Sequence, residues 1–262
     1  MPELPEVETV VRTLRPALVG RRILNAEFLQ LRVLRGSPIE TAKSLAGRRI
    51  KSIERHGKFI AIRLDRGYLV IHLGMTGKLL VNAAPTKWTH AIFTLDQGIL
   101  HYDDQRQFGR LEYGVELPPR VAALGPEPLE ITLADFTARV RARRSPVKAV
   151  LLNQAVVRGM GNIYADEALF RAGVHPKRAA ASLRKERIEL IYNAMREVLA
   201  EAIESRGSSV SNYVDADGRK GSFQTAHRVY RRTGKPCTKC GAEIKRIVLV
   251  QRGTHFCPKC QR

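Results

Sequence analysis

The stretch from residue 237 to residue 260 reads Cys237-Thr-Lys-Cys-Gly-Ala-Glu-Ile-Lys-Arg-Ile-Val-Leu-Val-Gln-Arg-Gly-Thr-His-Phe-Cys-Pro-Lys-Cys260. Two Cys-x2-Cys pairs separated by sixteen residues present four thiolates to one tetrahedral ion, as structural zinc sites do. The apolar run 247–250, a turn and a return strand predict a β-hairpin with Arg252 at its tip. Two disulfides in a secreted module are the alternative, which the lack of a visible signal peptide opposes. We therefore predict a zinc ribbon held by Cys237, Cys240, Cys257 and Cys260.

Charge and composition indicate a globular protein that binds a polyanion. The chain has 262 residues, 44% of them hydrophobic, which is enough for a real core and excludes a disordered tail. Lys and Arg number 45 against 25 Asp and Glu, and residues 206–262 alone hold 13 against 3. Such an excess favours nucleic acid as the partner over a membrane surface. No apolar run approaches 18 residues, so we expect no membrane span.

Hydrophobic periodicity divides the remaining chain into an N-terminal β region and a helical region. Helical spacing from Leu4 to Leu14 is followed by short alternating runs from 22 to 113, and these predict an antiparallel sandwich or barrel. A proline-rich stretch, 118–130, reads as a linker. Helices follow, with Gly159-Met-Gly-Asn162 between two of them and a long one over 182–206. The predicted domains are therefore 1–117, helical 131–226 and zinc-binding 227–262, in an α+β fold.

Five spaced motifs carry a family resemblance. They are Met1-Pro-Glu-Leu-Pro-Glu-Val-Glu8, Arg55-His-Gly-Lys-Phe59, His72-Leu-Gly-Met-Thr-Gly77, Gly159-Met-Gly-Asn-Ile-Tyr-Ala-Asp-Glu167 and the cysteine pairs with Gln251-Arg-Gly-Thr254. In this order they closely resemble the bacterial formamidopyrimidine-DNA glycosylases, from end to end. The Pro-Glu-Leu-Pro-Glu opening favours this family over its sister, endonuclease VIII. The resemblance implies an N-terminal helix with an antiparallel β-sandwich, a helix-two-turn-helix domain and a zinc-ribbon hairpin.

The resemblance implies an enzyme that removes oxidised purines (8-oxoguanine and formamidopyrimidines) and then cleaves the abasic site by β,δ-elimination. The amine of Pro2, exposed once Met1 is removed, would be the nucleophile. Glu3 resembles the general acid and Glu6 a supporting carboxylate. Lys58 resembles the proton donor of the β step, and Arg252 the arginine of the δ step. Besides one structural Zn²⁺, no organic cofactor is implied.

The same resemblance implies residues that hold the duplex. Met75, Arg106 and Phe108 would fill the space of the extruded base, with Arg106 reading the orphaned cytosine. The loop Asp103-Asp-Gln-Arg-Gln-Phe-Gly109 departs from the usual Asp-Pro-Arg-Arg-Phe-Gly, because it lacks the proline and the second arginine. Ser222 and Phe223 resemble part of a lid over the base. The expected DNA contacts are His72, His90, Arg106, Asn162, Arg143 and Lys148, to which Arg158 adds positive charge.

The expected partner is double-stranded DNA that contains oxidised purines, with no membrane involved. The protein is expected to act as a monomer in the bacterial cytoplasm, on the nucleoid. Two alternatives remain: an endonuclease VIII-type glycosylase of oxidised pyrimidines, and a DNA-binding protein that has lost catalysis. The intact set Pro2, Glu3, Glu6 and Lys58 argues against the second.

Overall fold

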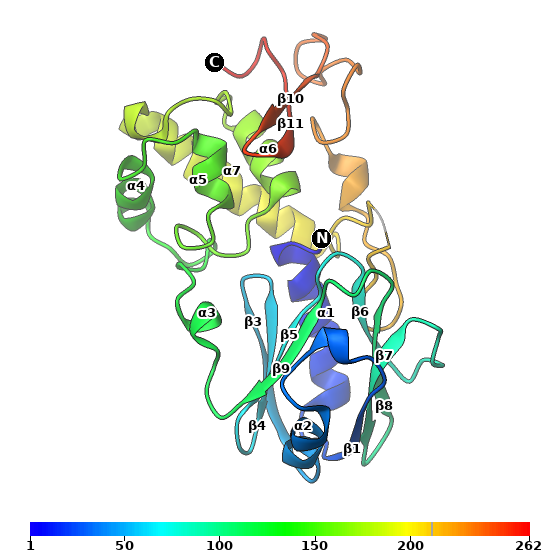
Figure 1. Ribbon diagram of the computed structural model, residues 1–262. Coiled ribbons are helices and arrows are strands. Elements are labelled where there is room, and N and C mark those ends of the chain that lie inside the picture. The colour runs from blue at the N-terminus through cyan, green and yellow to red at the C-terminus, as the bar shows by residue number, and fades with distance from the viewer. Residues whose placement is uncertain (211) are drawn as a thin grey trace. The chain divides into compact units, whose positions relative to one another are not determined.

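The computed structural model describes residues 1–210 and 212–262, which form two compact units (Figure 1). The first unit comprises Met1–Ala123 together with Ser205–Ser222, and the second comprises Leu124–Glu204 together with Phe223–Arg262. The predicted domain limits remain predictions. The packing adds one feature that they lack, because residues 205–222 follow the long helix of the second unit yet pack with the first.

Two β-sheets form most of the first unit. One has the strand order β1-β7-β8-β6 and the other β2-β9-β5-β4-β3. All pairs are antiparallel except the short β2–β9 pair, which is parallel. The strands are β1 (Ile23–Phe28), β2 (Leu34–Arg35), β3 (Ile50–His56), β4 (Phe59–Leu64), β5 (Tyr68–His72), β6 (Gly77–Val81), β7 (Thr89–Leu95), β8 (Ile99–Asp104) and β9 (Arg110–Gly114).

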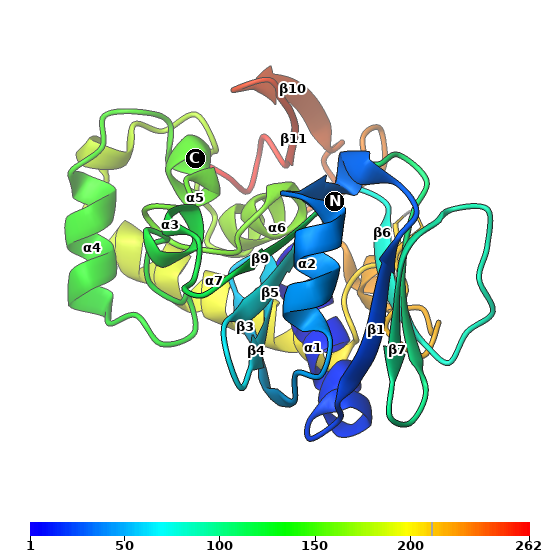
Figure 2. The same ribbon diagram turned by 60° about the horizontal axis from the view of Figure 1, so that its bottom comes forward.

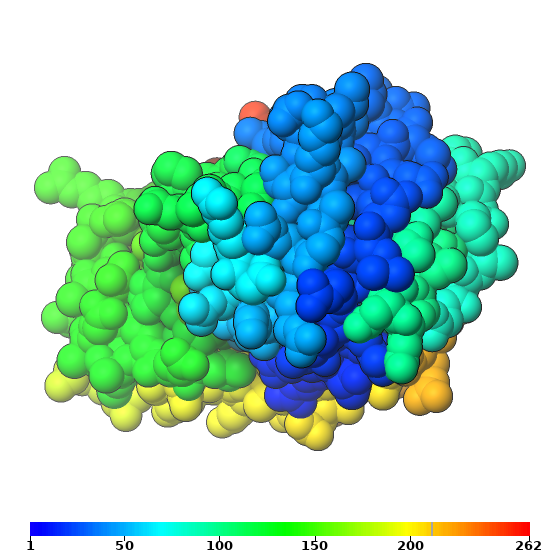
Figure 3. Space-filling view, turned by 90° about the horizontal axis from the view of Figure 1, so that it is seen from below, coloured from blue at the N-terminus to red at the C-terminus, as the bar shows by residue number. Residues whose placement is uncertain are grey.

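Helix α1 (Leu4–Leu18) contacts strands of both sheets, which stand as separate layers in Figure 2. Its apolar face repeats every three to four residues, so Val7, Val11 and Leu14 are fully buried in a core shared with both sheets. Tyr213 and Ala216 of the returning segment join the same core. On the face shown in Figure 3, the end of α1 (dark blue) lies beside β3 (light blue). Arg15, Val19 and Ile53 of these two elements border a largely apolar hollow of about 570 Å³. The remaining helices of this unit are α2 (Pro38–Leu45), α3 (Pro119–Ala122) and the 3-10 turn η1 (Leu31–Val33).

The second unit is helical, with one hairpin. Its elements are α4 (Leu133–Arg141), α5 (Val147–Leu152), α6 (Asn162–Arg171), η2 (Ala180–Ser182), α7 (Lys185–Glu204), η3 (Phe223–Ala226), β10 (Lys245–Leu249) and β11 (Arg252–Phe256). Helix α6 packs against α5, α7 and β11 and is buried over eight consecutive residues. Gly159, with φ +88°, lies in the turn that separates α5 from α6.

The predicted α+β fold class is confirmed, including the helix, the sandwich, the helical domain and the hairpin. The long helix is α7, which begins three residues later and ends two residues earlier than the sequence predicts. Among the described residues, no helix is both long and apolar enough to cross a membrane.

Candidate active site

The start of α1 is buried and tightly held. Pro2 is buried, and the carboxylates of Glu3 and Glu6 are 4% and 2% exposed. Glu6 Oε2 accepts a hydrogen bond from Glu3 N at 2.8 Å, and Glu6 Oε1 accepts one from Ser208 N at 2.7 Å. A Cβ on Gly207 would lie only 2.7 Å from Glu6 Oε1. The Gly207-Ser208 turn therefore anchors Glu6, a partnership that the sequence analysis missed.

The α-amine of the chain lies in an unusual environment. Burial is the largest effect and lowers the pKa of the Met1 amine, Lys58 and Arg106 lower it further, and Glu3 and Glu6 raise it. The net shift is downward, which favours the uncharged amine. The same groups would surround the Pro2 amine after removal of Met1. The structure thus brings Pro2, Glu3, Glu6 and Lys58 into one electrostatic environment.

Lys58 and His72 lie on adjoining strand ends. Lys58 is 9% exposed at the β3–β4 turn, and the ring of Phe59 packs on that of His72 at 4.9 Å. Burial lowers the pKa of His72 to about 4, with Lys58, Arg120 and Arg110 adding to the shift. His72 Nδ1 accepts from Gly74 N at 3.2 Å, so the neutral ring carries its proton on Nε2. That N–H can donate to a phosphate oxygen.

The three predicted wedge residues are on two loops that pack together. A Cβ on Gly74 would lie 2.5 Å from Gly109 N, so the Gly74–Thr76 loop closely approaches the 105–109 loop. Met75 and Phe108 are 40% and 46% exposed, and the Arg106 guanidinium stacks on the Phe108 ring at 4.6 Å. An exposed apolar pair beside an exposed cation suits insertion between bases.

Asp104 holds the wedge loop in shape, and the sequence analysis missed this role. Its fully buried carboxylate accepts hydrogen bonds from Gly109 N at 2.8 Å, Arg106 N at 3.3 Å and the hydroxyl of Tyr102 at 3.2 Å. His90 Nε2 donates to Asp104 O at 2.8 Å, and His90 is only 5% exposed. The His90 ring therefore stabilises the loop from within, and its expected DNA contact stays a prediction.

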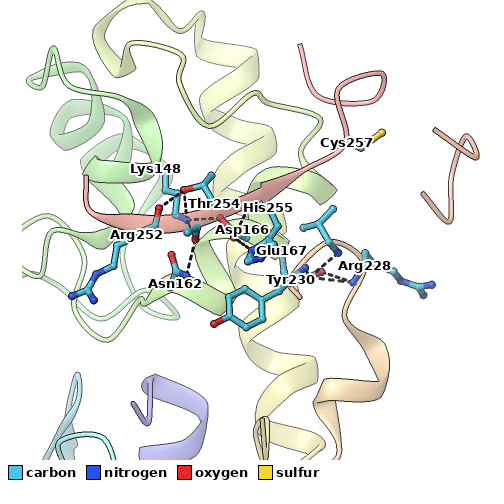
Figure 4. Close-up of polar contacts among 12 residues, drawn as sticks. Lys148, Asn162, Asp166, Glu167, Arg228, Tyr230, Arg252, Thr254, His255 and Cys257 are labelled. Atoms are coloured by element: carbon cyan, nitrogen blue, oxygen red, sulfur yellow. Dashed lines mark hydrogen bonds and ion pairs between the residues drawn. The ribbon is translucent and has the colours of Figure 1, made fainter. Parts of the chain in front are cut away.

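In the second unit, a buried charge cluster joins α5 and α6 to strand β11 (Figure 4). The Lys148 ammonium lies 2.6 Å from Asp166 Oδ1 and donates to Thr254 Oγ1 at 2.8 Å and to Gly253 O at 3.2 Å. Asp166 Oδ2 accepts from His255 N at 2.9 Å and contacts His255 Nδ1 at 3.0 Å. Lys148 is 0% exposed and holds this cluster together, and its predicted contact with DNA stays a prediction.

Asn162 and Arg252 lie next to this cluster, where strand β11 begins. Asn162 Nδ2 donates to Gly253 O at 2.9 Å, so the side chain links the first turn of α6 to the hairpin. Val250 and Gln251 adopt positive φ angles of 46° and 58°, which form a tight hairpin turn. Arg252 follows it, exposed, and Figure 4 shows its guanidinium pointing away from the cluster. The cluster therefore fixes the strand and leaves this cation available.

Glu167 ties the segment before the ribbon to α6. Its buried carboxylate accepts from the backbone N–H groups of Arg228, Val229 and Tyr230 at 2.9, 3.0 and 2.8 Å (Figure 4). Burial raises the pKa of Glu167, against the lowering effect of these donors. Asp166 and Glu167 belong to the Gly159–Glu167 motif, which was the only sequence signal for either role.

The other predicted residues are placed as follows. Arg143 is exposed just after α4. Arg158 forms an ion pair with Glu127 at 3.1 Å, so its charge is offset within the protein. Phe223 is 2% exposed and packs on Tyr164 at 5.8 Å between ring centroids, so it belongs to the core of the second unit. Ser222 is exposed, with its hydroxyl donating to Ser205 O at 3.3 Å.

The four cysteines fit one zinc ion. Their Sγ atoms all lie within 4.8 Å of one another, with Cys237–Cys260 at 3.9 Å and Cys240–Cys257 at 3.5 Å. A tetrahedron with 2.3 Å Zn–S bonds requires Sγ separations of about 3.8 Å. None of the four cysteines is bridged to another, so the alternative of two disulfides is not formed in the structure. Zinc would add to the small apolar cluster that Phe170, Val229 and Ile244 form beside Cys237 and Cys257.

Three family descriptions match successive parts of the chain. The formamidopyrimidine-DNA glycosylase N-terminal domain matches residues 1–111, the H2TH domain of the same proteins matches 124–214, and the zinc finger found in FPG and IleRS matches 234–262. The first two together cover more than half of the chain.

Relatives match over all or nearly all of their length. A curated formamidopyrimidine-DNA glycosylase of Solibacter usitatus is 58% identical, with 100% of both chains covered. The crystal structure of the MutM (Fpg) protein from Thermus thermophilus is 43% identical over 99% of this chain and 98% of that one, with a TM-score of 0.91. A Lactococcus lactis Fpg variant in complex with DNA containing Fapy-dG covers both chains completely at 36% identity, with a TM-score of 0.93.

Proposed function

The chain belongs to the formamidopyrimidine-DNA glycosylase family, and on that premise we propose that it excises oxidised purines from duplex DNA and cleaves the resulting abasic site. It is a base-excision repair glycosylase and lyase with one structural zinc. Its partner is double-stranded DNA carrying 8-oxoguanine or formamidopyrimidine. It acts in the bacterial cytoplasm on nucleoid DNA.

The N-terminal amine carries the chemistry. The uncharged Pro2 nitrogen attacks C1′ of the damaged nucleotide, the bond from C1′ to the base breaks, and the base leaves with a proton. Ring opening at O4′ then gives an iminium between Pro2 and C1′. Glu3, buried one residue away, is placed to protonate the ring oxygen. Glu6 is a positioning residue, since its two oxygens hold Glu3 N and Ser208 N.

Two cations serve the eliminations that follow. Loss of a C2′ proton breaks the C3′–O3′ bond, and a second elimination breaks the C5′–O5′ bond. Lys58, close enough to lower the pKa of the chain's amine, acts as proton donor at the first step. Arg252 grips phosphate at the second, since its guanidinium is exposed at the hairpin tip. Neither step needs a metal, and the zinc holds the ribbon.

The loops of the first unit read the duplex. Met75 and Phe108 fill the gap left by the extruded base, and Arg106 donates hydrogen bonds to the orphaned cytosine. His72, Asn162 and Arg143 hold phosphates. Ser222 stays a candidate for the lid, whereas the burial of Phe223 limits its part to fixing where that segment begins.

The observation that carries this proposal is the buried amine environment made by Glu3, Glu6 and Lys58. We expect borohydride to trap the protein covalently on a duplex with 8-oxoguanine opposite cytosine, and Pro2→Gly, whose terminal amine is primary, to lose most base release and trapping while lesion binding persists. Pro38→Gly is the matched control, because Pro38 also starts a helix. Undiminished trapping by a protein whose Met1 is shown by mass spectrometry to remain would exclude Pro2 as the nucleophile.

A further inference from the structure

Four arginines surround one hollow in the second unit, at the opposite end of β11 from Arg252. The hollow has a volume of about 420 Å³ and a mostly polar lining of Val174, Arg178, Ser182, Leu183, Arg184, Arg187 and Arg262. Strand β11 rises about 3.3 Å per residue, so its five residues alone separate the two ends by roughly 13 Å. This group of residues is distinct from those that the proposed function uses.

The arginines of the hollow differ from others in this unit in how their charge is compensated. All four arginines are exposed, and in the part of the chain that the structure describes none of them forms an ion pair with a carboxylate within 4.0 Å. Elsewhere in this unit, by contrast, Arg171 pairs with Glu201 at 2.6 Å and Arg139 pairs with Asp135 at 3.1 Å. Cations that line one hollow without a paired carboxylate repel one another unless an anion lies between them.

Hydrogen bonds fix the backbone that lines the hollow. The Arg262 backbone donates to Gly173 O at 3.2 Å, and Arg262 O accepts from His175 N at 3.3 Å. Gln261, 2% exposed, donates to Val174 O at 3.0 Å and accepts from Cys257 N at 2.8 Å. The second cysteine pair of the ribbon therefore fixes the Arg262 backbone against the connection between α6 and α7.

Helix α7 adds to the positive electrostatic potential at the hollow. It starts at Lys185, directly after Arg184, and its twenty residues give it a full macrodipole with the positive end at the hollow. Arg187, on the first turn, has its Nη1 atom 4.0 Å from the point where a Cβ on Gly173 would lie, so it reaches across to the ribbon side. Guanidinium forks and an N-terminal helix turn both suit the oxygens of phosphate.

We propose that this hollow is a second phosphate-binding site, separate from the site of base excision. Its ligand is a phosphate group, either in the DNA backbone beyond the lesion or free in solution as phosphate or pyrophosphate. The backbone case rests on the proposed function, because it would lengthen the contact of the same enzyme with its duplex. The free-phosphate case does not depend on it.

The test compares two triple variants. Arg178→Gln, Arg184→Gln and Arg187→Gln together remove three charges from the hollow. Arg22→Gln, Arg63→Gln and Arg66→Gln together remove three charges from the first unit, where Arg22, Arg63 and Arg66 are likewise exposed, and serve as the control. Zinc content and thermal melting of both should match the unchanged protein, since all six side chains are on the surface. Borohydride trapping on a short 8-oxoguanine duplex measures the proposed function separately.

Two ligands are then titrated, pyrophosphate by calorimetry and lesion duplexes of about 13 and 35 base pairs at several salt concentrations. We expect the hollow variant to bind pyrophosphate at least tenfold more weakly than the control variant. If the site takes DNA, its affinity for the long duplex alone also falls, and the log–log salt slope decreases by about 0.9 for each phosphate that is no longer bound. Weaker pyrophosphate binding with unchanged DNA binding assigns the site to free phosphate. Unchanged binding of both ligands, in a folded variant that is still trapped on the short duplex, overturns the proposal and leaves the proposed function intact.

Discussion

Lys148→Met is the substitution that most directly tests the buried cluster of the second unit. Lys148 and Asp166 are both essentially inaccessible, and the ammonium lies 2.6 Å from Asp166 Oδ1. Removing the cation leaves a buried carboxylate whose remaining partner is His255. Breaking a buried pair in this way costs about 3–5 kcal/mol in the free energy of unfolding. In a unit of this size that lowers the melting temperature by roughly 10–20 °C.

Denaturant unfolding at pH 8 measures this loss. Lys177→Met is the control, since Lys177 is exposed in the same unit, and it should change the free energy of unfolding by less than about 0.5 kcal/mol. The double variant Lys148→Met with Asp166→Asn should recover at least half of the loss, because the amide oxygen still accepts from His255 N and no charge stays buried. A Lys148→Met loss below about 1 kcal/mol would refute the structural role.

The same variant tests the link from the cluster to DNA. Lys148 donates to both Gly253 O and Thr254 Oγ1, next to Arg252. At a temperature where Lys148→Met is still folded, a displaced Arg252 should lower the log–log salt slope of duplex binding by about 0.9. An unchanged slope in a demonstrably destabilised variant would show that the cluster stabilises the fold without placing Arg252.

Three further predictions concern other parts of the molecule. Arg106→Ala should reduce the preference for cytosine over adenine opposite 8-oxoguanine by roughly 1–3 kcal/mol, measured as the ratio of excision rates; an unchanged ratio would move the reading role to another residue. Cys240→Ala should release one zinc per chain by elemental analysis and weaken DNA binding before the first unit unfolds, and a zinc-free unchanged protein would contradict the metal site. Because the pKa of His72 is lowered to about 4 in the folded state, its contribution to stability is complete above about pH 6.5 and is lost as pH falls towards 4. His72→Gln should therefore reduce the loss of unfolding free energy between pH 6.5 and pH 4 by up to about 3 kcal/mol. An identical pH dependence in the variant would show that folding does not lower the pKa of His72.

The sequence was sufficient to predict features whose interacting residues lie close together along the chain. The cysteine pairs specify a ribbon because zinc requires four thiolates, whatever surrounds them. The Glu3–Glu6 spacing likewise places Glu6 next to Glu3 N through helical geometry alone. Both features involve partners within one turn or one hairpin, so spacing is informative there.

The burial of a side chain by residues far away along the chain could not be predicted from residue spacing. In the sequence, Lys148 and His90 look like hydrogen-bond donors available to phosphate. Their partners Asp166, Thr254 and Asp104, however, lie 14 to 106 residues away along the chain. The sequence analysis missed the return of residues 205–222 to the first unit for the same reason. Gly207 and Ser208 contact the Glu6 carboxylate, which is about 200 residues away along the chain. A single sequence reports residue type and spacing, whereas solvent exposure depends on which segments meet.

The wedge loop, residues 103–109, lacks the usual proline and is held instead by hydrogen bonds to the buried Asp104 carboxylate. The usual proline would fix one φ angle near −65° and remove one N–H donor. In this loop Gln105 stands in the proline position, whereas Gln107, in the position of the second arginine, adopts φ +54°, a left-handed conformation unfavourable for its side chain. The buried Asp104 carboxylate holds the loop by accepting from the N–H groups of Arg106 and Gly109. Because those hydrogen bonds bracket Phe108, the loop can present Arg106 and Phe108 together without the proline. The loop's rigidity therefore depends on Asp104, and a substitution there should affect opposite-base reading as strongly as one at Arg106.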